Sequence, residues 1–361
     1  MLKLDRYILK QIILTLIFAI FALCIIFIVV NLMETMDKFI DAKVSLDIIT
    51  RYYLVYLPEI LKILTPVSVL LACLLTVGKL SNNNEITAMK TGGLSLYRLI
   101  FPIFILGVVL SLGQYYFNGW IVPAANEEKS RISEVHLKRG SGDGYISNLA
   151  FRDSPTRNIL MQYYDAEMKI AYKIAIEDYD TNMAPRLLSR LEAQQMYWND
   201  TLKKWILKDG IVTKIDESGH VRPERFDELP INIRINQKQL AKINKKTKEL
   251  TFDEMSDYIR LLRTGGKDVR KLEIEYRSEQ ALPLANFIVV FFAVTFASVK
   301  KRGGLAIQIA AAMVISFAYL ICFQLAKPIG LVVNVSPIII GWSSNILFFC
   351  AGVISLIKTR T

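Results

Sequence analysis

The chain has 361 residues, of which 53% are hydrophobic, and its formal net charge is +11. This composition excludes a single soluble domain with a polar shell. Most of the positive charge lies in short segments beside long apolar runs, so it does not indicate a nucleic-acid-binding protein.

Six runs of apolar residues are long enough to cross a membrane, which takes about 20 residues of α-helix. The first run is too long for a signal peptide, and no small-residue cleavage site follows it, so we expect it to be retained. The runs fall at about residues 12–30, 61–80, 99–116, 281–299, 305–326 and 338–357. The sequence therefore predicts three transmembrane helices on each side of a polar insert.

Basic residues predict the orientation of these helices. The two ends of the chain and the connections between spans two and three and between spans four and five hold eleven Lys and Arg residues against two acids, Asp5 and Glu85. Short loops keep Lys and Arg on the cytoplasmic side. Both termini and these two connections are therefore predicted to be cytoplasmic, and the insert extracytoplasmic.

The connection between spans two and three reads LSNNNEITAMKTGG, residues 80–93. Its asparagines are good N-cap residues, and Glu85 follows them in the first helical turn, where an acid is favourable. Gly92 or Gly93 can take the left-handed conformation that ends a helix. The pattern predicts a short helix over about residues 82–92.

Two apolar residues of this helix, Ile86 and Met89, are three positions apart and so share one face. They predict a small apolar knob that fits a groove on a cytoplasmic partner. The alternative is that Glu85 is a solvated acid on an interfacial helix and has no partner.

The polar insert, residues 126–250, contains short β-type stretches divided by turn residues. Such spacing predicts a small β domain, either a sandwich or a jelly roll. After it, Thr251 and Glu254 have capping-box spacing. Apolar residues then recur at helical spacing, which predicts an amphipathic helix that ends at Gly265 and Gly266. These apolar residues are Phe252, Met255, Ile259 and Leu262.

The sequence carries no pattern typical of an enzyme. It has no phosphate-binding GxxxxGK[ST] loop and no arrangement of an activated nucleophile, and its two histidines are far apart. We therefore expect no catalytic residue, cofactor or metal site. The functions that are left are transport, sensing and scaffolding. They include ion-coupled transport of a lipid or amphiphile, and the role of a membrane-anchored scaffold.

Ion-coupled transport would require charged residues deep in the membrane. The nearest candidates, Glu59 and Lys62, are predicted to pair within their own helix at the membrane interface. Asn286 and Gln308 are predicted to form hydrogen bonds between helices.

Four segments resemble one known family, the lipopolysaccharide-transport permeases of the LptF/LptG type, and they occur in its order. They are LDRYILKQ (4–11), NNNEITAMKTGG (82–93), LTFDEMSDYIRLLRTGGKD (250–268) and EYRSEQALPLANFIVVFFAVTFASVKKRGGLAIQIAAAMVISFAYL (275–320). The resemblance implies an α+β membrane protein with six transmembrane helices and a periplasmic β-jellyroll-like domain between helices three and four. The expected parts are residues 1–125, 126–250 and 251–361.

The resemblance also implies the partners of a lipopolysaccharide exporter in the bacterial inner membrane. They are a second LptF/LptG-type permease subunit, an LptB-like cytoplasmic ATPase dimer, an LptC-like single-span jellyroll protein, an LptA-like periplasmic bridge and lipopolysaccharide itself. Hydrolysis of ATP would belong to the separate ATPase, and nucleic acid is not a partner.

Two groups of site residues follow from the resemblance. The short helix becomes the ATPase-coupling helix, with Glu85, Ile86, Met89 and Gly92 as its contact residues. Lys327, at the end of span five, becomes a contact for lipid phosphates. Lys327 and the lack of a lysine within span one lean slightly to the F type of subunit, but the sequence does not decide between the F and G types. The alternative for Lys327 is an interfacial lysine that anchors its helix. Lys38 and Lys43, just outside span one, are weaker lipid candidates because acids surround them.

Overall fold

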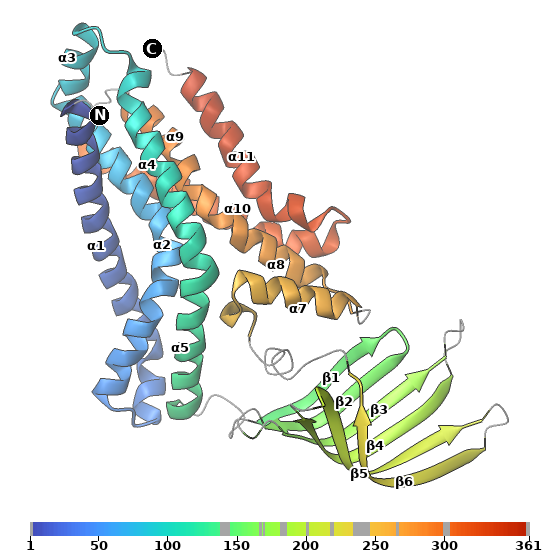
Figure 1. Ribbon diagram of the computed structural model, residues 1–361. Helices are drawn as coiled ribbons and strands as arrows, with labels where there is room; N and C mark the ends of the chain where they lie inside the picture. The colour runs from blue at the N-terminus through green and yellow to red at the C-terminus, as the bar shows by residue number, and fades with distance from the viewer. Residues whose placement is uncertain are drawn as a thin grey trace. The chain divides into compact units, whose positions relative to one another are not determined.

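The computed structural model describes residues 3–137, 145–165, 168, 170–180, 186–199, 202–216, 220–233, 246–264, 267–298 and 304–358. The chain divides into two compact units. Met1–Ile132 and Arg270–Thr361 form a helical unit, and Ser133–Val269 form a unit built around a β-sheet (Figure 1).

The helical unit contains long helices from both ends of the chain. Those before the β-sheet are α1 (Lys3–Asp41), α2 (Leu46–Asn82), α3 (Glu85–Thr91), α4 (Leu96–Tyr116), the π-helix η1 (Phe117–Ile121) and α5 (Val122–His136). Those after it are α8 (Arg270–Ala281), the 3₁₀ turn η3 (Leu282–Leu284), α9 (Ala285–Ser298), α10 (Gly304–Val332) and α11 (Pro337–Lys358).

Five segments of the described residues are long and apolar enough to cross a membrane. They are Lys3–Asp41, Leu46–Asn82, Phe101–His136, Ile309–Val332 and Pro337–Ile357. The third is longer than its apolar run because η1 and α5 continue α4 without a break. The remaining predicted span falls on α9, whose described part has 14 residues, and residues 299–303 after it lie outside the described part.

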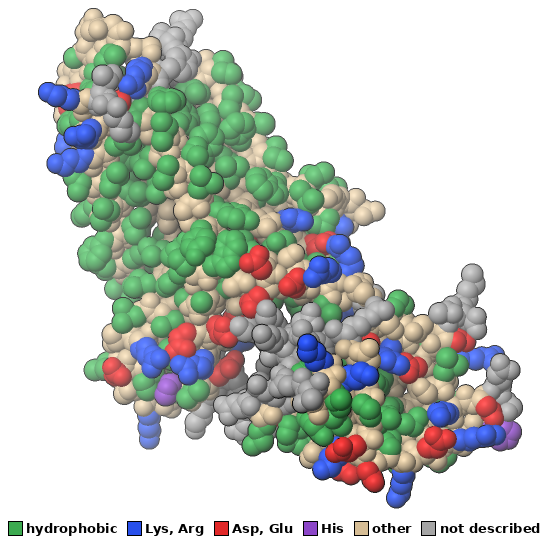
Figure 2. All heavy atoms as spheres, in the orientation of Figure 1, with side chains coloured by type: hydrophobic (Ala, Val, Ile, Leu, Met, Phe, Trp, Pro, Cys, Tyr) green, Lys and Arg blue, Asp and Glu red, His purple; other side chains and the backbone are tan. Residues whose placement is uncertain are grey.

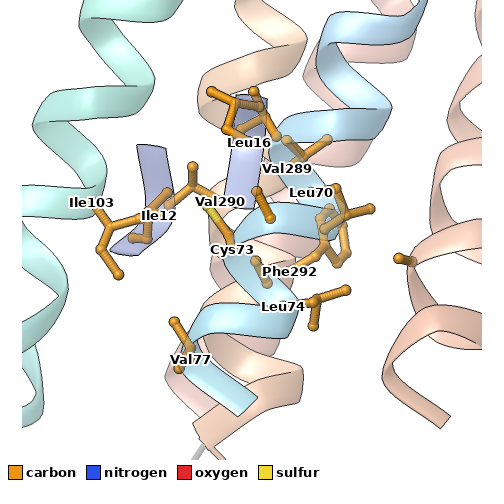
Figure 3. Close-up of a cluster of buried hydrophobic side chains, with 14 of the residues drawn as sticks. Ile12, Leu16, Leu70, Cys73, Leu74, Val77, Ile103, Val289, Val290 and Phe292 are labelled. Atoms are coloured by element: carbon orange, nitrogen blue, oxygen red, sulfur yellow. The ribbon is translucent and has the colours of Figure 1, made fainter. Parts of the chain in front are cut away.

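The core of the helical unit lies between α1, α2, α4 and α9. Leu70 and Leu74 of α2 are fully buried there and belong to the same cluster as Ile12 of α1, Ile103 of α4 and Val290 of α9 (Figure 3). Apolar residues also cover much of the outside of this unit, between charged groups near its two ends (Figure 2). A helical bundle that is apolar outside as well as inside is suited to lipid, because so large an apolar surface is unfavourable in water.

A proline in α2 explains a buried series of hydrogen bonds between polar groups in this core. Pro66 has no N–H, so it leaves the carbonyl of Lys62, four residues earlier, without its helical hydrogen bond. The side-chain amide of Gln114 donates to that carbonyl over 2.8 Å, and Asn286 donates to the amide oxygen of Gln114. The predicted interhelical role of Asn286 is confirmed, while the side chain of Gln308 lies outside the described part.

The second unit contains one antiparallel sheet of six described strands in the order β1-β2-β3-β4-β5-β6 (Figure 1). These are β1 (Tyr145–Ser154), β2 (Arg157–Asp165), β3 (Ile170–Tyr179), β4 (Leu187–Asn199), β5 (Lys204–Ile215) and β6 (Val221–Ile231). The predicted inserted β domain is confirmed. Its described strands follow a meander, whereas a full jelly roll has Greek-key connections.

An ion pair joins two strands of this sheet, and a helix that contains Leu261 packs against its core. Arg157 of β2 contacts Asp178 of β3 with an N–O distance of 2.6 Å, and the hydrogen bond to that carboxylate raises the pKa of Arg157. After the turn η2 (Thr247–Glu249) comes α7 (Phe252–Thr264).

The start and the apolar face of α7 match the sequence prediction. Glu254 accepts a hydrogen bond from the N–H of Thr251, and Thr251 Oγ1 accepts one from the N–H of Glu254, so the capping box is confirmed. The predicted apolar face is buried as well: Phe252, Met255, Ile259 and Leu262. Gly265 and Gly266 lie outside the described part.

Gly210 allows two neighbouring strands to approach β5. A Cβ atom at this position would lie 2.3 Å from Cζ of Phe226 and 2.4 Å from the carbonyl oxygen of Glu192. We expect Gly210→Ala to lower the stability of the β unit by about 1–3 kcal/mol, the usual cost of overpacking. Limited proteolysis of the full chain in detergent measures this, with Gly113→Ala as the control because nothing lies within 4 Å of its Cβ position. Equal protease resistance of the two variants would contradict the prediction.

Candidate functional site

The predicted short helix is α3, and it begins with a sharp reversal of the chain. The N–H of Asn83 closes the end of α2 by donating to the carbonyl of Lys79 over 3.0 Å. Asn84 then takes a left-handed conformation with φ of 59°, and its carbonyl accepts the hydrogen bond from the N–H of Ala88. Asparagine tolerates this conformation better than most residues. The polar asparagines thus make the turn as well as the start of α3.

The end of α3 is the predicted glycine stop. The N–H of Leu94 reaches back to the carbonyl of Met89 over 3.0 Å, and Gly93 has a φ of 86°. This is the hydrogen bond of a Schellman motif, which needs a left-handed residue just after the helix. The left-handed residue is therefore Gly93, while Gly92 still donates a helical hydrogen bond to Ala88.

Glu85 lies at the start of α3 and is partly exposed. One carboxylate oxygen accepts a hydrogen bond from the hydroxyl of Tyr7 and the other from the amide of Asn83, each over 3.2 Å. A carboxylate can accept about four hydrogen bonds, so these contacts orient Glu85 and leave it able to bind a further donor.

An ion pair holds the start of α1 to the start of α4 beside this helix. Asp5, which is buried, contacts Arg98 with an N–O distance of 3.0 Å. Ser95 caps α4 by accepting a hydrogen bond from the N–H of Arg98. Residues of α1 therefore position both helices that flank the turn at Gly93.

The apolar face of α3 packs against the core of the helical unit of the same chain. Ile86 is 5% exposed and belongs to the core of the helical unit, and Met89 packs against that core. This corrects the expectation that the two residues project from the chain as a knob. A seven-residue helix has little stability alone, so burying this face is what fixes α3 in place. Its exposed residues are mainly polar: Thr87 and Thr91 are exposed together with Ala88, Glu85 is partly exposed, and Asn83 and Asn84 are exposed in the turn before it.

A second charged group joins three helices of the same unit. Glu279 of α8 contacts Lys62 of α2 at 2.5 Å and Lys327 of α10 at 3.6 Å. Lys327 also lies over the ring of Phe323, 4.9 Å from its centre. Two cations share one carboxylate, so the group retains a positive charge.

This group corrects the predicted pair of Glu59 and Lys62. Each of the two contacts another helix instead: Lys62 pairs with Glu279, and Glu59 pairs with Lys129 of α5 at 3.1 Å. Sequence spacing made a local pair possible, but ion pairs within a membrane bundle also join different helices.

The other predicted lipid contacts lie at the end of α1 and in the turn that follows it. Lys38 is exposed near the end of α1. Lys43 is exposed too and has a φ of 50°, and its N–H donates to the carbonyl of Ile40 over 3.0 Å as the turn closes. Within the described part of the chain, neither lysine forms an ion pair with the Glu279 group.

Sequence reasoning missed two residues that contact Lys62. Glu279 belongs to the charged helix α8, where no local pattern distinguishes it from its neighbours. Gln114 could have been suspected, because Pro66 predicts an unpaired carbonyl in α2 and a glutamine in an apolar run is a natural donor.

Comparison with known proteins agrees with this architecture. A family described as "Lipopolysaccharide export system permease LptF/LptG" matches residues 6–358. The permease protein LptG of Escherichia coli K12 is 20% identical over 342 residues, which cover 93% of this chain and 92% of that protein. LptG of Haemophilus influenzae Rd is 18% identical over 240 residues, 66% of each chain. Both relatives are LptG proteins, whereas the sequence features leaned slightly to the F type. Because the family match extends over nearly the whole chain, this protein belongs to the LptF/LptG family of lipopolysaccharide export permeases.

Proposed function

We propose that this chain is a permease subunit of an ATP-driven exporter that extracts lipopolysaccharide from the inner membrane and passes it to a periplasmic bridge. The observation that carries the proposal is the family match over residues 6–358, together with a chain that divides into an apolar helical unit and a β unit. Family membership and several apolar helices make it a multi-pass inner-membrane protein of the lipopolysaccharide export system and a transport subunit.

The energetics of extraction support a separate energy source. Exposing an acyl chain to water costs about 0.8 kcal/mol per methylene group, and a lipid with several chains multiplies that cost. Binding alone cannot supply this free energy in every transport cycle. An LptB-like ATPase dimer on the cytoplasmic side is the partner that this requirement favours.

The helix α3 is the proposed contact with that ATPase. Ile86 and Met89 pack in the core of the helical unit, so the exposed side of α3 is left to contact the ATPase. On that side, Glu85 can accept further hydrogen bonds. Gly92 is exposed at the end of this surface. The charge distribution of the sequence favours a cytoplasmic position for α3 and for both termini, and a periplasmic position for the β unit.

The sheet edges are the proposed contacts with the bridge. In the described sheet β1 and β6 are the outer strands, and an outer strand has backbone groups that can pair with another chain. An LptC-like and an LptA-like protein would each extend such an edge. A second LptF/LptG-type subunit would complete the membrane part.

We expect Glu85→Gln to weaken association with the ATPase at least tenfold and to lower ATP-driven lipid release, while the chain still folds and inserts. Loss of a charged contact at an interface commonly costs about 2 kcal/mol or more, and 1.4 kcal/mol is a factor of ten. Co-purification with the ATPase and lipid release from proteoliposomes measure the two effects.

The matched control is Tyr7→Phe, which removes the hydrogen bond that orients Glu85 and keeps the carboxylate. A much smaller effect of Tyr7→Phe supports a direct contact of Glu85 with a cation. Unchanged association and unchanged release in Glu85→Gln would refute the coupling role.

Lipid contact at the three lysines is tested by photocrosslinking from positions 38, 43 and 327. Labelled lipopolysaccharide at position 327 supports the lipid role of Lys327, and label at none of the three removes this part of the proposal. Lys327 is the strongest candidate because the Glu279 group retains a positive charge.

A further inference from the structure

The strands of the β unit bend along a line that crosses the sheet. We call this bend at Lys173, Gln194 and Asp209 the crease. Lys173 of β3 and Asp209 of β5 have φ angles of 50° and 54°, although neither is glycine. Gln194 of β4 lies between them, because its neighbours Ala193 and Gln195 pair with residues on both sides of Lys173 and of Asp209. A left-handed residue in a strand bends it and costs about 1–2 kcal/mol.

Burial along the strands confirms the crease. Ala171 and Ile174 of β3 are both buried although they are three positions apart, and Ala193 and Met196 of β4 show the same step. In a regular strand, residues three apart point to opposite faces. The crease therefore turns each strand so that both halves of the sheet bury their apolar side chains on one face.

The crease leaves a groove on the opposite, exposed face. Two depressions, of about 360 and 470 Å³, share Lys173 and Gln194 in their linings and therefore adjoin. The larger is also lined by Tyr163, Tyr172 and Gln195. Tyr163 and Tyr172 are directly paired across β2 and β3, and Tyr163 is 40% exposed.

The lining of this groove has the side-chain types that contact sugars. Aromatic rings carry a negative face that attracts the C–H groups of a pyranose ring, while amides such as Gln194 both donate to and accept from hydroxyl groups. The smaller depression is not a free cationic site, because Arg190 pairs with Glu192 at 2.6 Å and Asp209 is part of the lining. A few polar groups around an aromatic surface are typical of small-ligand sites.

We propose that this groove binds the saccharide part of the exported glycolipid, on the face of the sheet opposite to its apolar core. The inference rests on the proposed function, which supplies a ligand with both a sugar portion and acyl chains.

The test uses the full purified chain in detergent and the oligosaccharide released from lipopolysaccharide by mild acid hydrolysis. We expect saturable binding by calorimetry, at least tenfold weaker in Tyr163→Ala and in Gln194→Ala. The matched control is Tyr197→Ala, which removes a tyrosine of β4 that is paired with Glu228 and does not line the larger depression. Protease resistance of all three variants checks that each remains folded.

Absence of oligosaccharide binding at millimolar concentration, or equal binding by Tyr163→Ala and the control, would overturn the proposal. Displacement of the oligosaccharide by a free fatty acid would overturn it as well, because an acyl site would then be indicated. Lipid release by the wild-type complex is measured separately. If release is normal and oligosaccharide does not bind, the groove proposal fails while the proposed transport function stands.

Discussion

Replacing Arg270 with alanine is expected to lower the stability of the helical unit by about 2–4 kcal/mol. Its guanidinium donates to the carbonyl of Gly330 over 3.1 and 2.9 Å and to those of Val333 and Val335 over 2.5 and 2.8 Å. The last carbonyls of a helix have no partner within the helix, and a cation there also interacts favourably with the helix dipole. Hydrogen bonds to charged groups contribute about 1.5–3 kcal/mol each, and relaxation reduces the sum.

We call these hydrogen bonds of Arg270 the clamp, and the position of Arg270 in the chain gives the clamp a second, local effect. Arg270 is the first residue of the helical unit after the β unit, which ends at Val269. It holds the end of α10 and its connection to α11 at the residue where the chain returns from the β-sheet. Loss of the clamp should therefore loosen the α10–α11 connection before the remainder of the bundle unfolds.

Thermal unfolding in detergent and hydrogen exchange of residues 330–336 measure these two effects. The matched control is Arg277→Ala on the same helix, since Arg277 donates a hydrogen bond to Gln280 of its own helix and not to the connection between α10 and α11. Arg270→Lys should recover a small part of the stability, because an ammonium lacks the planar fork that reaches several carbonyls at once. Equal melting temperatures for Arg270→Ala and Arg277→Ala would contradict the prediction.

The length and period of apolar runs predict much of this fold for physical reasons. A helix that crosses a lipid layer must satisfy its own backbone, so a long apolar run in the sequence specifies it directly. The face of α7 is equally local: Phe252, Met255, Ile259 and Leu262 follow the helical period and are buried. Gly93 ends α3 because a left-handed residue is needed there and glycine adopts it freely.

What a predicted face contacts cannot be read from the same local rules. Ile86 and Met89 share a face as expected, yet that face packs on the chain's own core, because an apolar face binds any apolar surface within reach. Glu59 and Lys62 have the spacing of a local pair, yet Lys129 and Glu279 arrive from other helices. The crease at Lys173 and Asp209 was missed for a related reason, since its signal is the register of three strands.

Glu279→Gln is expected to destabilise the helical unit and to expose Lys327 to an anionic ligand. The carboxylate neutralises two lysines from two helices, Lys62 at 2.5 Å and Lys327 at 3.6 Å. Removing one partner from a buried pair costs about 3–5 kcal/mol. The three side chains are 15% to 31% exposed, so solvent screening reduces the expected loss to about 1–3 kcal/mol.

The same variant distinguishes the two interpretations of Lys327. If Lys327 contacts lipid phosphates, Glu279 competes with the lipid for this cation, and Glu279→Gln should increase lipid contact severalfold. If Lys327 only anchors α10 at the membrane interface, the stability falls and lipid contact does not change. A photoreactive residue at the exposed position 331, one helical turn from Lys327, reports lipid contact without replacing the lysine.

The control is Glu279→Gln combined with Lys327→Gln, which removes the proposed lipid contact together with its competitor. Crosslinking in this double variant should fall below that of the wild type, while its stability should exceed that of Glu279→Gln because one unneutralised cation is gone. The lipid role of Lys327 is refuted if crosslinking is equal in the wild type and both variants. Glu279 would then serve only to join α2, α8 and α10, and the lipid phosphates would have to be bound elsewhere on the chain or by the second permease subunit.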